Sequence, residues 1–406
     1  MNFNPTELIA RAERDCAQAF QRFEEIEYAN TKKLLNSFKA HEISYRHFAP
    51  TTGYGYDDVG RDTLSMLFAE FLGTETALVR PQIASGTHAL AICLFGMLRP
   101  GDTLLSASGA PYDTLGDIIG LTGKAGDGSL KDLGVNYKQV ELREGKLDID
   151  AILAALDDSV KLVEIQRSRG YDWRASLGVG EINEAIDAIH KARPSVCVMV
   201  DNCYGEFTDT GEPRADVLAG SLIKNAGGGF APTGAYLAGT AACMEKIAYR
   251  LTSPGIGAEV GSYAASYRPF YQGLFLAPHV VCQALKTQCL FSRAFELMGY
   301  EVHPKCGDVR NDIIQAIRFG DADKLIRFIQ LIQEFSPIDS QAIPEPWEMP
   351  GYQDKVIMAA GTFVSGASIE LSADAPIRPP FIAYMQGGLS YTHGKIVLEE
   401  MLKRGI

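Results

Sequence analysis

The sequence lacks the patterns of a secreted, membrane-spanning or metal-binding protein. Its eight cysteines form no CxxC pair and its seven histidines show no HxxxH spacing, so neither a disulfide framework nor a zinc site is expected. The segment Met1–Pro5 lacks the basic and then apolar pattern of a signal peptide. No run approaches the roughly eighteen apolar residues of a membrane span. We therefore expect a cytoplasmic protein that binds no metal.

The chain is also poor in positive charge. Its 406 residues carry 38 Lys and Arg against 50 Asp and Glu, which gives a net charge of −12. This excess of acid argues against general binding to nucleic acid or to an anionic membrane, but it is compatible with one local pocket for a phosphate. No GxGxxG motif follows an early strand, which disfavours a nicotinamide-binding Rossmann fold.

Predicted strands and helices alternate along the chain, which indicates an α/β fold with a mainly parallel sheet. A length of 406 residues is typical of two or three domains. We expect a helical N-terminal arm over residues 1–50, a large domain over 51–280 and a smaller C-terminal α/β domain over 281–406. A long amphipathic helix over 279–298 is expected to link the domains.

The most informative stretch begins with the apolar run Val196–Val200, which is typical of a strand buried on both faces of a parallel sheet. Asp201 follows directly, at the strand end where ligands bind in such sheets. A second strand-like segment delivers Lys224 into a glycine-rich loop. This pair suits pyridoxal 5′-phosphate (PLP), because Lys224 could form a Schiff base and Asp201 could keep the pyridine nitrogen protonated. A simple salt bridge at a strand edge is the alternative.

Two further segments could contact such a cofactor. Ser85, Gly86 and Thr87 open a predicted helix, where free backbone amides form an anion site, although Ser85 could equally be a simple N-cap. Tyr112 follows the predicted strand 103–106, and its ring could lie flat against an aromatic cofactor.

Other candidate residues lie in loops at either end of the chain. Tyr54, Tyr56 and Arg61 fall in an aromatic, glycine-rich segment and could donate hydrogen bonds to a phosphate, or the segment could be a packing loop. A strand is predicted over 368–371. Arg378 is expected in a stiff loop beyond the last strand, as a clamp on a carboxylate or as an ordinary surface arginine.

Six motifs in order give the chain a resemblance to fold type I PLP enzymes. It is most similar to the cystathionine/methionine γ-lyase branch, and within it to the aluminium-resistance or methionine-γ-lyase-like proteins. The motifs together span most of the chain, and they read TTGYGYDDVGRDTL, SGTHAL, EIQRSRGY, VDNCYGEF, SLIKNAGGG and GASIELSADAPIRPP.

The resemblance implies a role for each candidate. Lys224 is the Schiff-base lysine, Asp201 the partner of the pyridine nitrogen and Tyr112 the residue that stacks on the ring. The phosphate is bound by a set of small residues, namely Ser85, Gly86, Thr87 and Ser221.

The same resemblance predicts an active site shared between subunits. Tyr56 and Arg61 are similar to a segment donated to the neighbouring subunit's phosphate site, which implies a homodimer and commonly a homotetramer. Arg378 is expected to bind the substrate α-carboxylate, with Tyr54 and Arg169 as further substrate contacts.

The implied activity is PLP-dependent elimination at the β or γ carbon of an amino acid, with a sulfur leaving group. Two departures concern the substrate more than the cofactor. Ile223 precedes the lysine where lyases usually have Thr, and Arg167–Arg169 stands where they have an Asn-containing segment. The alternatives are a PLP-dependent transferase, such as an aminotransferase or a sulfhydrylase, and a PLP-binding stress protein with little turnover.

Overall fold

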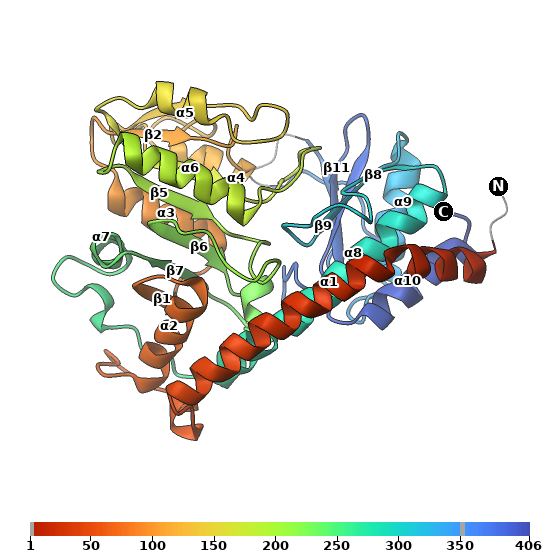
Figure 1. The fold of residues 1–406 in the computed structure, drawn as a ribbon, viewed down its shortest axis with the longest axis horizontal. Coiled ribbons are helices and arrows are strands. Elements are labelled where there is room, and N and C mark those ends of the chain that lie inside the picture. Colours follow the sequence, from red (N-terminus) through yellow and green to blue (C-terminus); the bar gives the residue numbers. More distant parts are fainter. Residues whose placement is uncertain (1–3, 350–353) are drawn as a thin grey trace.

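The computed structural model describes residues 4–349 and 354–406, which form two sheets connected by long helices (Figure 1). The larger sheet has seven strands in the order β1-β7-β6-β5-β4-β2-β3. β1 and β7 are antiparallel to their neighbours, and the other strands run parallel. The strands are β1 (Thr76–Arg80), β2 (Thr103–Ser106), β3 (Asn136–Gln139), β4 (Val160–Gln166), β5 (Cys197–Asp201), β6 (Val217–Ser221) and β7 (Ala235–Gly239).

Helices cover both faces of this sheet, which explains why its central strands are apolar throughout. In β5, Val198 and Val200 face one core, whereas Cys197 and Met199 face the other. The first core contains α2 (Val59–Leu72), α5 (Ile149–Ala155), α6 (Val179–Ala192) and part of α8 (Arg268–Leu297). The second contains α3 (Gly86–Met97), α4 (Asp113–Ile119) and α7 (Ala241–Leu251).

The smaller sheet is antiparallel and has the order β10-β11-β12-β9-β8. Residues such as Ala373 and Met385 pack against helices on one face, and Tyr384 points from the other face toward aromatic residues of the large domain. Its elements are β8 (Glu301–His303), β9 (Ile314–Arg318), α9 (Ala322–Glu334), β10 (Val356–Ala359), β11 (Ser372–Pro376), β12 (Ile382–Gln386) and α10 (Tyr391–Lys403).

Two long helices, α1 (Pro5–Ala40) and α8, lie side by side and run past both sheets (Figure 1). The first turns of α1 pack Leu8 and Ile9 into the small-domain core, and its later turns pack Phe23 and Leu34 into the large-domain core. Short 3₁₀ helices occur at Tyr45–Phe48, Asn225–Gly227 and Gly257–Glu259. No described helix has the length and apolarity needed to cross a membrane.

Three details of the secondary structure differ from expectation, in one helix, one strand and one loop. The helix predicted over 279–298 begins at Arg268, because the structure accommodates Pro278 inside the helix. The predicted boundary between residues 280 and 281 therefore falls within one continuous helix. The strand predicted over 368–371 is wrong, since β11 starts at Ser372, and Arg378 lies in the β11–β12 hairpin rather than beyond the last strand.

Candidate functional site

Asp201 and Lys224 come together at the carboxyl edge of the large sheet. Asp201 is the last residue of β5, is buried, and pairs with Ala219 of β6. Lys224 follows β6 by three residues, and its ammonium interacts electrostatically with Asp201. Burial raises the pKa of Asp201, whereas Lys224 and a hydrogen bond from the Cys203 amide (3.1 Å) oppose that shift. The site thus places the amine of Lys224 near the buried carboxyl group of Asp201.

The Lys224 amine is surrounded by acidic groups and one aromatic ring. Its Nζ lies 4.0 Å from the centre of the Tyr204 ring, a cation–π distance. Burial favours the neutral amine, but Cys203, Tyr204 and Asp201 outweigh this effect and raise the pKa of Lys224. Tyr204 is fixed in turn because its hydroxyl accepts a hydrogen bond from Ser368 (3.2 Å).

The start of α3 forms a cradle beside these residues. Ser85 caps the helix by accepting a hydrogen bond from the His88 amide (3.1 Å). A Cβ on Gly86 would lie 3.2 Å from the Cys203 sulfur and 3.4 Å from the Ser221 Cβ, so the helix start approaches both strand ends closely. The N-cap interpretation of Ser85 is confirmed, and the anion site stays a prediction at a helix start that lies beside Ser221.

A row of three tyrosine rings, which we call the aromatic wall, runs from Tyr112 through Tyr171 to Tyr384 of the small domain. Tyr112 is the N-cap residue of α4, and its ring centre lies 6.2 Å from that of Tyr171, which in turn lies 5.2 Å from that of Tyr384. Thr114 links this wall to the cradle, because its hydroxyl lies 3.1 Å from that of Thr87. Tyr112 is therefore close to the start of α3, because Thr114, two residues later in the chain, contacts it.

A second carboxyl group, that of Asp374, faces the same region from β11. Asp374 pairs with Tyr384 across the sheet and interacts with Tyr171, Gln386 and Lys224. Burial raises its pKa to about 6, and these three neighbours limit the rise. Its buried Oδ1 has no hydrogen-bond partner. The small domain therefore presents an acid toward the lysine.

The glycine-rich loop after Lys224 packs directly on α8. A Cβ on Gly228, which has a φ of 55°, would lie 2.3 Å from the Gly273 carbonyl oxygen, and one on Gly273 would lie 2.2 Å from the Gly227 carbonyl oxygen. Side chains are excluded on both sides of this contact. In addition, the Asn225 amide donates to the carbonyl oxygens of Tyr204 and Glu206, each at 2.9 Å. The lysine is thus positioned from two directions.

Arg169 is a buried residue in contact with the small domain. Its buried guanidinium donates to the His303 carbonyl oxygen (2.9 Å) and lies 3.5 Å from Asp312, so it connects β4 to the small domain. These contacts give Arg169 a structural role, and the substrate contact expected of it stays a prediction. Arg378 is exposed and paired with Asp354 (2.9 Å), at the mouth of a cavity of about 130 Å³ lined also by Tyr171 and Tyr384.

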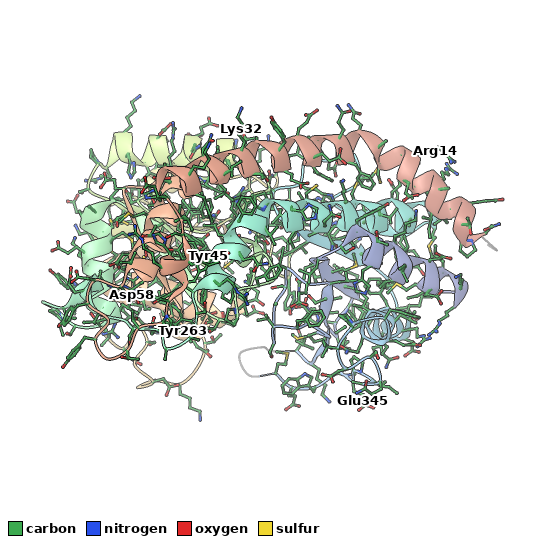
Figure 2. The ribbon with its side chains drawn as sticks, turned by 90° about the horizontal axis from the view of Figure 1, so that it is seen from below. Arg14, Lys32, Tyr45, Asp58, Tyr263 and Glu345 are labelled. Atoms are coloured by element: carbon green, nitrogen blue, oxygen red, sulfur yellow. The ribbon has the colours of Figure 1, made fainter. Side chains whose placement is uncertain are left out.

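The segment with Tyr54 and Tyr56 lies at the protein surface. Both tyrosines are exposed, and their ring centres lie 5.5 Å apart. Asp58 caps α2 and accepts a hydrogen bond from Tyr267 (3.0 Å); Figure 2 shows Asp58 and Tyr263 together at the end of the molecule away from Glu345. Arg61 donates to the Gly55 carbonyl oxygen (2.8 Å) and lines a different cavity, of about 630 Å³.

Three residues near the lysine were missed in the sequence. Cys203 and Tyr204 follow Asp201 by two and three positions, and this proximity to a strand-end acid was the available signal. Asp374 gave no comparable signal, because its place beside Lys224 depends on how the small domain packs against the large one.

The fold and its comparisons define the class of protein. The mainly parallel sheet, with its polar residues at the strand ends, is the architecture of fold type I PLP enzymes. The sequence profile of the methionine γ-lyase family matches residues 5–406, and the chain belongs to that family.

Several relatives are similar over nearly the whole chain. A crystal structure of a carbon–sulfur lyase involved in aluminium resistance from Clostridium novyi NT has a TM-score of 0.95 and 52% identity, covering 100% of this chain and 97% of its own. The uncharacterized protein YnbB of Bacillus subtilis is 52% identical over 387 residues, which are 94% of this chain and 92% of YnbB. The methionine γ-lyase CalE6 of Micromonospora echinospora shares the fold alone, at 16% identity and a TM-score of 0.58, covering 88% and 97%.

Proposed function

We propose that this protein is a PLP-dependent lyase that cleaves the carbon–sulfur bond of a sulfur-containing amino acid by β or γ elimination. The observation that carries the proposal is the convergence of Lys224, Asp201 and the start of α3 at one edge of the sheet. Family membership and the similarity to a carbon–sulfur lyase support the leaving group.

The residues present fit PLP on chemical grounds. The start of α3, with Ser85, Thr87 and the adjacent Ser221, provides amides and hydroxyls for the phosphate. Lys224 provides the amine for the aldehyde, and Asp201 provides the acid for the ring nitrogen. A side chain at Gly86 would crowd the Cys203 sulfur, since its Cβ would lie only 3.2 Å from that atom.

When bound, PLP would supply an electron sink for the pair of electrons left after an amino acid loses its α-proton. Lys224 would take that proton at its Nζ and return it later in the reaction. Asp201 would keep a proton at the ring nitrogen, because the buried site disfavours separation of their charges. Tyr112 would orient the ring. Arg378 would release Asp354 and bind the α-carboxylate of the substrate instead.

The first test is the visible absorption spectrum of the purified protein with PLP. We expect an absorption band in the wild type that borohydride bleaches, that Lys224→Ala abolishes, and that Lys191→Ala, at an exposed lysine of α6, retains. A wild type that stays colourless in the presence of PLP contradicts the cofactor and every role assigned through it.

Product analysis separates the proposed lyase from its two alternatives. A lyase releases ammonia, a keto acid and a thiol from methionine, cystathionine or an S-alkyl cysteine. A transferase instead yields a new amino acid without free ammonia. A spectrum that no amino acid changes supports a PLP-binding stress protein and contradicts both enzymes.

A further inference from the structure

Two cysteines form a close pair at the edge of the large sheet opposite Asp201. Cys197 is the first residue of β5 and is buried, whereas Cys243 is the third residue of α7 and is partly exposed. Their sulfur atoms lie 3.8 Å apart. We propose that Cys197 and Cys243 are a peroxide-sensitive thiol pair that closes into a reversible disulfide.

The surroundings of Cys243 make it the thiol that reacts first. It lies in the first turn of α7, where the helix dipole favours an anion, and its amide donates to the Thr240 hydroxyl (3.4 Å). A hydrogen bond from Cys197, then the Thr240 hydroxyl and the Lys246 ammonium lower the pKa of Cys243 to about 7, although burial opposes them. A partly exposed thiolate is the form that attacks a peroxide.

Asp216 is a negatively charged group near both cysteines, and its charge is partly balanced by other neighbours. Asp216 disfavours a thiolate on both cysteines, but its carboxylate accepts a hydrogen bond from the Val198 amide (2.7 Å) and lies 2.9 Å from His190. Cys93 of α3 is a third thiol nearby; its burial raises the pKa of its own thiol, so it stays protonated. Among Cys93, Cys197 and Cys243, the last alone therefore combines access to solvent with a stabilised anion.

The chemistry balances with a hydroperoxide as the oxidant. The Cys243 thiolate attacks one peroxide oxygen, the O–O bond breaks, and a sulfenic acid and hydroxide form. The Cys197 sulfur then attacks the sulfenic sulfur, and its proton leaves with the displaced hydroxyl as water. Two thiols and one hydrogen peroxide give one disulfide and two waters. The sulfur atoms must approach by roughly 1.8 Å to reach a normal S–S bond.

The disulfide would close the segment that carries the candidate cofactor residues. Asp201, Ser221 and Lys224 all lie between Cys197 and Cys243 in the sequence. Linking the ends of that segment restricts the unfolded chain, so the oxidised protein should be the more stable form. The proposal needs no bound cofactor and holds whatever reaction the site performs.

A second group of thiols provides an internal control. Cys16 and Cys289 are fully buried, and each sulfur donates to a main-chain carbonyl at 3.5 Å, Cys16 to Cys289 and Cys289 to Cys306. Without access to solvent, a peroxide cannot reach either thiol. These cysteines should stay reduced under the conditions that oxidise Cys243.

The test treats the full-length protein with stoichiometric hydrogen peroxide and maps the cysteines by mass spectrometry without reduction. We expect a single linked peptide pair, Cys197 with Cys243, the loss of two free thiols, and a rise in Tm of about 2–4 °C that dithiothreitol reverses. Unchanged thiols, a link between other cysteines, or a link between two molecules would overturn the proposal.

Single variants locate the reactive sulfur. In Cys197→Ser, a sulfenic acid on Cys243 should persist and be trapped by dimedone, whereas Cys243→Ser should not react. Cys289→Ser should form the same link as the wild type, since its thiol is buried. A sulfenic acid trapped on Cys197 in Cys243→Ser would contradict the assignment of Cys243 as the attacking thiol.

Discussion

The carboxyl group of Glu206 interacts electrostatically with Lys224 and is itself buried. Its side chain is fully buried, and Oε1 accepts a hydrogen bond from the Tyr236 hydroxyl (2.7 Å) while Oε2 has no partner. Burial raises its pKa to about 8, although the Tyr236 bond and its own amide oppose the shift. Glu206 is therefore held in the protonated form at neutral pH, and its ionisation couples folding to pH.

Glu206→Gln should remove this coupling. The folded protein keeps the Glu206 proton between about pH 4.5 and about pH 8, where the unfolded chain has lost it. Wild-type stability therefore falls as pH rises through that window, by about 1.4 kcal/mol per pH unit from this group. Glutamine keeps the acceptor for Tyr236 without titrating. Urea unfolding of both proteins near pH 5.5 and pH 7.5 measures the two slopes, with the exposed Glu184→Gln as control. Parallel slopes would refute the assigned pKa.

Arg169→Met should destabilise the protein rather than change substrate affinity alone. Removal of the guanidinium leaves the buried Asp312 without its cation, which costs about 3–5 kcal/mol. The matched control is Arg214→Ala, whose pair with Asp187 is exposed and contributes about 0–1 kcal/mol. Chemical denaturation checks both variants. Wild-type stability in Arg169→Met, combined with a raised KM, would contradict the structural role and favour the predicted contact with substrate.

At the residue scale, the sequence predicted what depends on neighbours along the chain. Asp201 and Lys224 could be found because each follows a strand, and parallel strands place their ends at one edge. Asp374 and the ion pair of Arg169 could not be found, because both depend on contacts between segments more than 100 residues apart. Their side chains acquire a role only when the two sheets meet.

At the scale of elements, the contact between the lysine loop and α8 should be intolerant of side chains. Gly273→Ala places a methyl group 2.2 Å from the Gly227 carbonyl oxygen, so either α8 or the loop must move. We expect a loss of about 1–3 kcal/mol in stability from this overpacking, together with weaker PLP retention. Gly180→Ala on α6 meets no atom within 4 Å and should be neutral or slightly stabilising. Thermal melting and cofactor retention measure both, and equal behaviour of the two variants would contradict the packing argument.

The elements themselves were predictable where periodicity and turns agree. The buried run before Asp201 became β5, and the glycine after residue 72 ends α2 in a left-handed conformation. The errors lie where tertiary packing overrides local signals. The helix was predicted to start at residue 279, but α8 begins earlier and continues through Pro278 because its apolar face is buried along both domains. Short strands such as β11 also gave the wrong boundary, since Ser372–Pro376 lacks β-branched residues.

At the scale of the whole molecule, α1 and α8 connect the two sheets by packing against both. Each helix contributes buried residues to both cores, so the relative position of Asp374 and Lys224 depends on the packing of these helices. Tyr54 and Tyr56, in contrast, stay exposed within one chain. Because their segment is anchored by Asp58 while their hydroxyls stay free to reach outward, we predict that these tyrosines complete the phosphate site of a second copy.

Mixed oligomers test this sharing of sites. Tyr56→Phe removes only an exposed hydroxyl, so the variant should fold normally and lose phosphate binding in the partner's site. Lys224→Ala abolishes the reactive amine. When the two inactive variants are refolded together, random pairing gives half heterodimers, each with one intact site, and about a quarter of wild-type activity should return. Each variant refolded alone is the control, and sedimentation verifies the oligomer. Only sharing of sites between subunits can bring an intact Tyr56 and an intact Lys224 into one site. If the mixture stays inactive while heterodimers form, Tyr56 therefore acts within its own chain or not at all.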